Sequence, residues 1–255
     1  MNSQIPYIIL LVFFCISSCS SQKDIFYLQK SNTDKTYNLD YNEYTIKVDD
    51  ILKIDLKTND PEINLLFENK NAYNLNSNKE SILYNGYQVD VNGNIHFNEI
   101  GKIQVANLTI NQVRDKLYEK ITNMGILLNP LLDIKIINSH FTILGEVNMP
   151  GRYEFMQNNL NIFEAIGMAG DLTITGKRSN VMLIREIDNK KLINEIDLTN
   201  INLLESENFQ IISNDIIIVN PNRTKINSAG LIGNSSTLIT LLSFILSSII
   251  LITNN

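Results

Sequence analysis

Residues 141–170 read FTILGEVNMPGRYEFMQNNLNIFEAIGMAG, and they decide the fold of the second half of the chain. Residues 141–147 and 152–155 both read as strands, and Pro150-Gly151 lies between them. Proline presets φ at one corner of a turn, and glycine supplies positive φ at the next. The sequence therefore predicts two strands joined by a Pro-Gly turn.

A short helix is predicted after these strands. Asn161 can cap its first turn, while Glu164 lies three residues later and can reach back to the cap residue. Gly170 ends the helix, because glycine readily adopts the left-handed conformation. The apolar face of the helix is formed by Ile162, Ala165, Ile166 and Ala169.

Three strings from this half, GEVNMPGRY, NIFEAIGMAGD and GKRSNVMLIRE, closely resemble the SLBB domain. This β-grasp-like domain occurs in outer-membrane polysaccharide export lipoproteins of the Wza type. The predicted SLBB domain covers residues 139–221, with a basic loop at 176–178 and further strands at 181–186, 192–198 and 215–219.

Aromatic residues are the usual platforms of sugar sites, and this domain offers Tyr153, Phe155 and Phe163. Core packing explains these three residues better than a sugar platform does. The resemblance implies instead that SLBB domains stack side by side into a ring.

Residues 41–138 resemble the polysaccharide export domain of the same family, through YTIKVDDILKI and GYQVDVNGNIHFNEIGKIQV. Alternating polarity predicts strands at 44–48 and 51–56, and Asn92-Gly93 is a strong hairpin signal. A helix capped by Thr109 follows, then a strand at 131–138, and Pro61 begins a short helix over 61–67. These elements predict an α+β fold class, and the resemblance implies that the two small domains are periplasmic.

Two turns of this chain lack the glycine that the family usually has. Asp49 and Asn214 stand at those positions. Both residue types tolerate left-handed backbone better than most, so we expect both turns to form.

The N-terminus has the pattern of a lipoprotein signal peptide. An apolar run at residues 5–16 is too short to span a bilayer, and small residues precede Cys19, as in a bacterial lipobox. The resemblance implies a signal peptide over 1–18, lipidation of Cys19, and a polar tether over 19–40. The alternative is an ordinary secretory signal with incidental cysteines.

Residues 222–255 are predicted to form a linker and a C-terminal transmembrane helix. Residues 231–252 are free of charge and long enough to cross the hydrocarbon core as a helix. Hydroxyl residues recur on one face of this helix: Ser236, Thr240, Ser243 and Ser247. They can line a pore, bond to their own helix carbonyls, or hold neighbouring helices together.

Composition excludes several other functions. The net charge of −6 offers no basic surface for nucleic acid. Cys15 and Cys19 are the only cysteines, so the folded body has no disulfide or thiolate metal site. His96 and His140 have no second ligand at metal-binding spacing, and no nucleotide fingerprint is present. We therefore predict no metal and no cofactor.

The resemblance implies a non-enzymatic translocon subunit for capsular or extracellular polysaccharide. It implies a homo-oligomer, an octamer in the family, that forms a helical-barrel pore in the outer membrane. It also implies contacts with membrane lipid and with an inner-membrane polysaccharide co-polymerase, often one with a tyrosine kinase domain.

Two other classes of function are considered. One is a lipid-anchored glycan-binding or scaffold protein that forms no pore. The other is a glycan hydrolase, which requires paired carboxylates in a cleft. The nearest cluster in sequence is Glu146, Glu154, Glu164 and Asp171.

Overall fold

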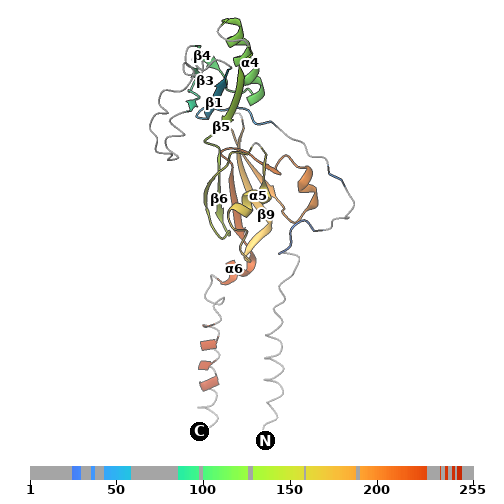
Figure 1. Ribbon diagram of the computed structural model, residues 1–255. Coiled ribbons are helices and arrows are strands. Elements are labelled where there is room, and N and C mark those ends of the chain that lie inside the picture. The colour runs from blue at the N-terminus through green and yellow to red at the C-terminus, as the bar shows by residue number, and fades with distance from the viewer. Residues whose placement is uncertain are drawn as a thin grey trace.

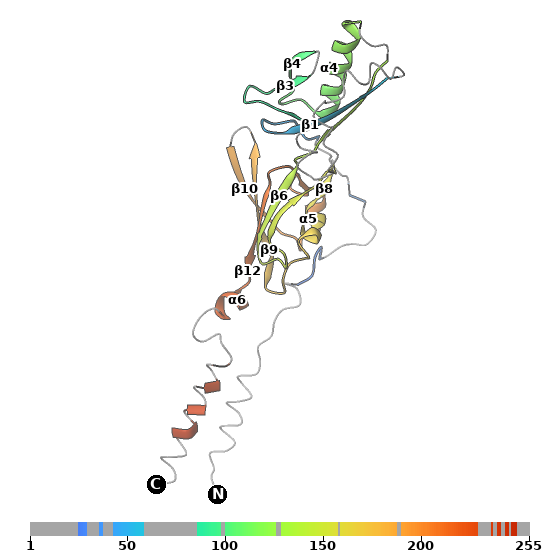
Figure 2. The same ribbon diagram turned by 60° about the vertical axis from the view of Figure 1, so that its left-hand side comes forward.

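The computed structural model describes residues 25–29, 36–37, 43–58, 86–97, 100–125, 129–157, 159–187 and 190–228, and eight residues between 236 and 248. These residues form two domains, each with its own cluster of buried hydrophobic side chains. The domains lie one above the other in both views (Figure 1, Figure 2). Cys15, Cys19 and the predicted helix at 61–67 lie outside the described residues.

The first domain is built on a three-stranded antiparallel sheet of order β2-β1-β5. Its strands are β1 (Ile51–Lys57), β2 (Tyr87–Gln88) and β5 (Leu131–Ile136). β3 (Asn94–Phe97) and β4 (Gly101–Gln104) pair as a separate hairpin. Alternate residues of β1 and β5 are buried, which confirms the predicted period of two.

Helix α4 (Ile110–Asn123) packs against this sheet. The Thr109 side chain accepts a hydrogen bond from the Gln112 N–H, and the Gln112 side chain accepts one from the Thr109 N–H. These two bonds form a capping box, which confirms the predicted start of the helix. The buried residues recur every four positions along one face: Val113, Leu117 and Ile121.

The second domain is built on a five-stranded sheet of order β10-β9-β12-β6-β7. β6 and β12 run parallel at its centre, and the other pairs are antiparallel. The strands are β6 (His140–Gly145), β7 (Gly151–Glu154), β9 (Gly176–Ile187), β10 (Lys190–Ile196) and β12 (Ile216–Pro221).

The chain segments between β7 and β9 and between β10 and β12 carry the short elements of this domain. They are β8 (Leu160–Asn161), α5 (Ile162–Met168), the 3-10 helix η3 (Ile201–Glu205) and β11 (Gln210–Ile211). β8 and β11 pair with each other. α6 (Arg223–Ser228) follows β12.

The local backbone predictions are largely confirmed. Asn161 and Glu164 exchange the two bonds of a capping box, at 2.9 and 3.0 Å. Gly170 follows α5 with φ of 74°, and Asp49 and Asn214 have φ of 70° and 71°. These residues therefore adopt the left-handed backbone that their turns require.

Two strand predictions in the first domain are wrong. Residues 44–48 make only an isolated bridge, between Thr45 and Thr109, in place of a strand. Asn92-Gly93 does form a turn, but the strands on either side of it pair with other partners. The reason is that Asp90 accepts the N–H groups of both Asn92 and Asn94, which bends the chain out of β2.

The predicted positive φ at Gly151 is also wrong. Gly151 begins β7 opposite Ile143, and its φ lies outside the left-handed region. The reversal is spread over residues 146–150, where the Met149 N–H donates to the Ala169 carbonyl at 2.9 Å. Contacts with the end of α5 therefore replace a tight turn.

Among the described residues, no helix is long and apolar enough to cross a membrane. The predicted spanning segment, residues 231–252, falls largely outside them. Its eight described residues are all helical.

Candidate functional sites at the two ends of the second domain

Residues 25–29, here called the N-terminal strap, lie against the second domain. The Leu28 N–H donates to the Leu198 carbonyl at 3.1 Å, and the Gln29 N–H donates to the Thr199 carbonyl at 2.6 Å. Gln29 also forms a parallel bridge with Asn200. This part of the predicted tether is therefore bound to the folded domain.

Tyr27 is the main side-chain contact of the strap. Its ring meets Phe163 edge-on, with centroids 5.6 Å apart. Its hydroxyl donates to the Asp171 carboxylate. Burial, together with this hydrogen bond, raises the pKa of Tyr27 to about 12, so the hydroxyl stays protonated at neutral pH.

Arg178 lies beneath Tyr27 and is only 4% exposed. Its guanidinium carbon lies 5.1 Å from the centre of the Tyr27 ring. One of its nitrogens, Nη1, donates to the carbonyls of Thr173 and Gly176 at 3.4 and 3.3 Å, and Nε has no partner among the described residues. The predicted basic loop at 176–178 is therefore wrong, because these residues begin β9 and bury the arginine.

Glu146 connects this region to the start of α6. Its carboxylate accepts the hydroxyls of Thr173 and Thr175 at 2.7 and 2.5 Å, and lies 3.8 Å from Lys225 Nζ. The hydroxyl groups, and to a lesser degree Lys225, lower the pKa of Glu146. The Asn222 N–H donates to the Thr175 carbonyl at 2.7 Å.

The N-terminal strap and α6 therefore meet at one end of the second domain. Thr173 links Arg178 to Glu146. Its carbonyl accepts a hydrogen bond from Arg178, and its hydroxyl donates one to Glu146. Both views place this end away from the first domain (Figure 1, Figure 2).

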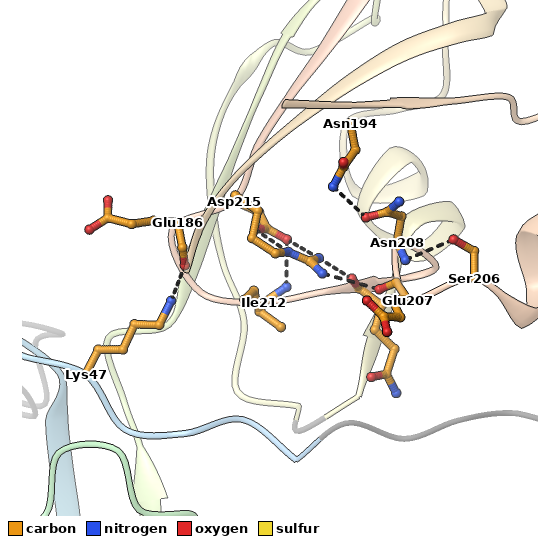
Figure 3. A network of polar contacts seen from close by, with 10 residues as sticks. Lys47, Glu186, Asn194, Ser206, Glu207, Asn208, Ile212 and Asp215 are labelled. Carbon is orange, nitrogen blue, oxygen red and sulfur yellow. Dashed lines mark hydrogen bonds and ion pairs between the residues drawn. The ribbon is translucent and has the colours of Figure 1, made fainter. Parts of the chain in front are cut away.

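The opposite end of the second domain faces the first domain through a polar network (Figure 3). Arg185 and Asp215 form a two-point ion pair, with Nε to Oδ1 at 3.0 Å and Nη2 to Oδ2 at 2.7 Å. Asp215 is 1% exposed and also accepts the Ile212 N–H at 2.9 Å. Lys47, from the first domain, donates to the Glu186 carbonyl at 2.8 Å.

Tyr44 and Asp50 extend the polar contacts on the first-domain side. The Tyr44 hydroxyl donates to Asp50 Oδ2 at 3.0 Å. Burial, followed by the nearby Asp50 charge, raises the pKa of Tyr44. Burial also raises the pKa of Asp50, although the Lys47 N–H and the Tyr44 hydroxyl oppose that effect.

A cavity of about 450 Å³ lies between the two domains. The first domain lines it with residues of α4 and β5, and the second with residues 155–157, 159 and 211–213. Arg114, Gln157 and Asn159 are among its polar residues, and Phe155 and Met156 among its apolar ones. Its volume lies within the range of about 300–1,000 Å³ that small-molecule sites occupy.

The structure adds detail to the predicted hydroxyl face. Ser236, Thr240, Ser243 and Ser247 are helical and exposed. The hydroxyls of Thr240 and Ser243 donate to the carbonyls of Ser236 and Ile239, one turn earlier. Bonding to the helix's own carbonyls, one of the three alternatives, is therefore present for these two residues.

Three of the four carboxylates considered for a hydrolase each have their own hydrogen-bond partners among the described residues. Glu164 accepts the Asn161 N–H, Asp171 accepts the Tyr27 hydroxyl, and Glu146 accepts two threonine hydroxyls. These contacts give each of the three a role in capping or in packing.

Sequence reasoning missed Arg178, Arg185 and the strap. Arg185 and Asp215 both fall in predicted strands, where a charged residue at a buried position is an available signal. Tyr27 lies in a short apolar run, residues 25–28, without the sustained period of a helix or strand, so the sequence did not indicate that it packs against the second domain.

Comparison with known proteins agrees with this two-domain architecture. Residues 39–136 match the family described as polysaccharide biosynthesis/export protein, and residues 139–219 match the SLBB domain. The chain belongs to this family of polysaccharide export proteins.

Two curated relatives resemble part of the chain. The EPS I polysaccharide export outer membrane protein EpsA of Ralstonia nicotianae is 31% identical over 104 residues, which cover 39% of this chain and 27% of the relative. The protein of the same name from Ralstonia solanacearum is 29% identical over the same shares. The match therefore spans about a quarter of the length of each relative.

Proposed function

We propose that this protein is an outer-membrane subunit for the export of capsular or extracellular polysaccharide and that it catalyses no reaction. The observation that carries this proposal is the order of its parts: an export domain, then an SLBB domain with the N-terminal strap and α6 together at the end away from the export domain. The names of the two relatives, both outer membrane proteins, support an outer-membrane location.

The position of the N-terminal strap supports a short lipid anchor at Cys19. Tyr27 lies eight positions after Cys19, a stretch that spans at most about 30 Å when fully extended. A lipid on Cys19 then holds the strap end of the SLBB domain close to the membrane, and the domains face the periplasm. α6 lies at the same end of the domain, so we expect residues 231–252 to reach the same membrane as the lipid.

The proposal also includes a pore through the outer membrane. Residues 231–252 of several copies form a helical barrel, and an inner-membrane polysaccharide co-polymerase, with or without a tyrosine kinase domain, supplies the polymer. Ser236 and Ser247 face the lumen together with Thr240 and Ser243, whose hydroxyl oxygens can still accept hydrogen bonds from passing sugars. Closed rings of identical subunits are a common form of homo-oligomer.

A second candidate function is a lipid-anchored glycan-binding or scaffold protein that forms no pore. The back-bonded hydroxyls of Thr240 and Ser243 favour this alternative, because a helix that satisfies its own hydroxyls does not require a water-filled lumen. The mass of the assembled protein separates the two candidates.

The test is complementation of a deletion strain. The full-length gene should restore secreted polysaccharide, whereas Cys19→Ala and a chain stopped after Ser228 should not, and both variants should remain detectable by immunoblot. The detergent-extracted full-length protein should have the mass of a closed ring. Normal secretion without the gene would reject an export role, and a monomeric extract with intact secretion would favour the scaffold.

A further inference from the structure

The cavity between the domains has one wall with free amide groups and apolar surface. Phe155 is half-buried, with its ring centroid 6.1 Å from that of Phe141, and Met156 is 72% exposed. Gln157 and Asn159 are exposed, and their side-chain amides make no hydrogen bond to the described residues. This wall therefore combines an apolar surface with side-chain amides that can both donate and accept hydrogen bonds.

The other wall carries Arg114, whose side chain is held in place by one hydrogen bond while its other guanidinium nitrogens lack an acceptor among the described residues. Arg114 is half-buried on α4, and its Nη1 donates to Asn111 Oδ1 at 2.8 Å. Asn111 donates in turn to Glu43 at 3.1 Å, which fixes its orientation. Within the described part of the chain, no carboxylate pairs with Arg114, and no acceptor meets its Nε or Nη2.

This arrangement suits a sugar better than most other small ligands. A sugar ring has apolar C–H faces and a rim of oxygens at close spacing. The planar arginine fork binds two such oxygens at once, whether they are neighbouring hydroxyls or a carboxylate. The amides can complete the hydrogen bonds of the remaining hydroxyls, and the cavity is large enough for a small ligand.

We propose that the cavity binds a saccharide segment of one or two units. The free nitrogens of Arg114 hold a pair of sugar oxygens, Gln157 and Asn159 bind further hydroxyls, and Phe155 with Met156 packs against the ring. The inference rests on the proposed function and deepens it, because the ligand is a piece of the exported polymer. Since both domains contribute, a bound sugar bridges them.

A binding measurement tests the role of Arg114. The probes are short oligosaccharides from partial hydrolysis of the polysaccharide that the producing cells secrete, separated into neutral and uronate-containing fractions. Calorimetric titration of the full-length protein in detergent should detect binding, and Arg114→Gln should weaken it at least about tenfold. Arg152→Gln removes an exposed arginine of β7 outside the cavity and should bind as the parent protein does.

The two fractions identify the oxygens that Arg114 holds. A loss confined to the uronate fraction assigns a carboxylate, and an equal loss in both fractions assigns hydroxyls. No binding of either fraction by the parent protein, or equal binding by Arg114→Gln at an unchanged melting temperature, would overturn the proposal.

Photo-crosslinking in the producing cells locates the sugar independently. Met156→p-benzoylphenylalanine places the probe in the cavity, and Ile174→p-benzoylphenylalanine places it at a residue of the same domain that is 67% exposed and outside the cavity. We expect a glycan-reactive adduct at position 156 alone. A protein–protein adduct, or no adduct at 156, would reject the sugar as occupant. If deletion of the gene still stops secretion in that case, the cavity inference fails while the export role stands.

Discussion

The guanidinium carbon of Arg178 lies 5.1 Å from the centre of the Tyr27 ring, so a residue of the N-terminal strap covers a buried cation of the second domain. The two residues are far apart in sequence and belong to segments with different roles in the proposed function. Their contact ties the predicted lipid anchor to the domain that leads into α6. Tyr27 is the strongest side-chain contact of the strap. Its ring lies against the Arg178 cation and meets Phe163 edge-on, and its hydroxyl donates to Asp171.

Tyr27→Ala should release the strap. Loss of the ring and hydroxyl removes on the order of 2–3 kcal/mol of local stability, by the usual sizes of cation–π, aromatic and hydrogen-bond contributions. Hydrogen exchange of the Leu28 and Gln29 N–H groups, which donate to the second domain, should accelerate by more than about tenfold. Phe26→Ala changes an exposed neighbour, 58% accessible, and should leave both rates unchanged. Equal rates in all three proteins would show that backbone bonds alone hold the strap.

Asp215→Ala should strongly destabilise the second domain. The change leaves the Arg185 guanidinium buried without its carboxylate, which costs about 3–5 kcal/mol in comparable buried pairs. Urea denaturation measures the change in the free energy of unfolding. Asp55→Ala breaks the exposed pair with Lys53 and should cost less than about 1 kcal/mol. A loss for Asp215→Ala as small as that of the control would mean that the carbonyls of Glu207 and Gln210 hold the charge by themselves.

Glu146 should make stability depend on pH in the acidic range. Its pKa is lowered in the folded protein from the ordinary value of 4.5, so the unfolded chain binds the proton more readily. The stabilising contribution is present above pH 4.5 and disappears as pH falls through the lower folded-state pKa. Glu146→Gln should therefore unfold more easily than the parent protein at pH 7, and the difference should vanish well below pH 4.5.

The Thr175 hydroxyl is the largest cause of this lowered pKa, so Thr175→Val provides a test of the mechanism. In the Thr175→Val background, the Glu146→Gln change should have a smaller effect at pH 7. A difference that stayed constant from pH 7 to pH 3 would contradict a role for the Glu146 charge. Unfolding by urea at each pH supplies the measurement.

Gly145→Ala should prevent β6 and β12 from pairing as they do. Gly145 has φ of 89°, and an added Cβ would lie 2.1 Å from the Val219 carbonyl oxygen. Strained backbone and a backbone clash together predict a loss of more than about 3 kcal/mol in the free energy of unfolding. The matched control is Gly167→Ala in α5, where a Cβ meets nothing within 4 Å and the change should stabilise by about 0.5–1 kcal/mol. A well-folded Gly145→Ala protein would contradict the close approach of the two strands.

Local features of the fold were predictable because they depend on residues close together in sequence. The capping box of Asn161 and Glu164 closes within four residues, and Asp49 and Asn214 adopt left-handed backbone as their residue types allow. Strand pairing was less predictable. The turn at Asn92-Gly93 formed as expected, but Asp90 redirected the chain so that its flanking strands found different partners.

In the candidate sites, too, local features were predictable from the sequence and long-range contacts were not. The hydroxyl face from Ser236 to Ser247 follows from helical spacing, whereas the bonds of Thr240 and Ser243 to helix carbonyls do not. The cavity needs residues of both domains, and neither Arg114 nor Gln157 carries a motif.

The family, the two-domain order and the helix caps follow from the amino-acid sequence alone, because motifs, periodicity and capping act over short distances along the chain. Three features emerge only from the packing of distant segments: Arg178 is buried under Tyr27, Asp215 is paired with Arg185, and the strap and α6 lie at one end of the domain. A buried charge is stable only where distant segments bring it hydrogen bonds or an opposite charge. Which segments meet is set by the packing of the whole domain.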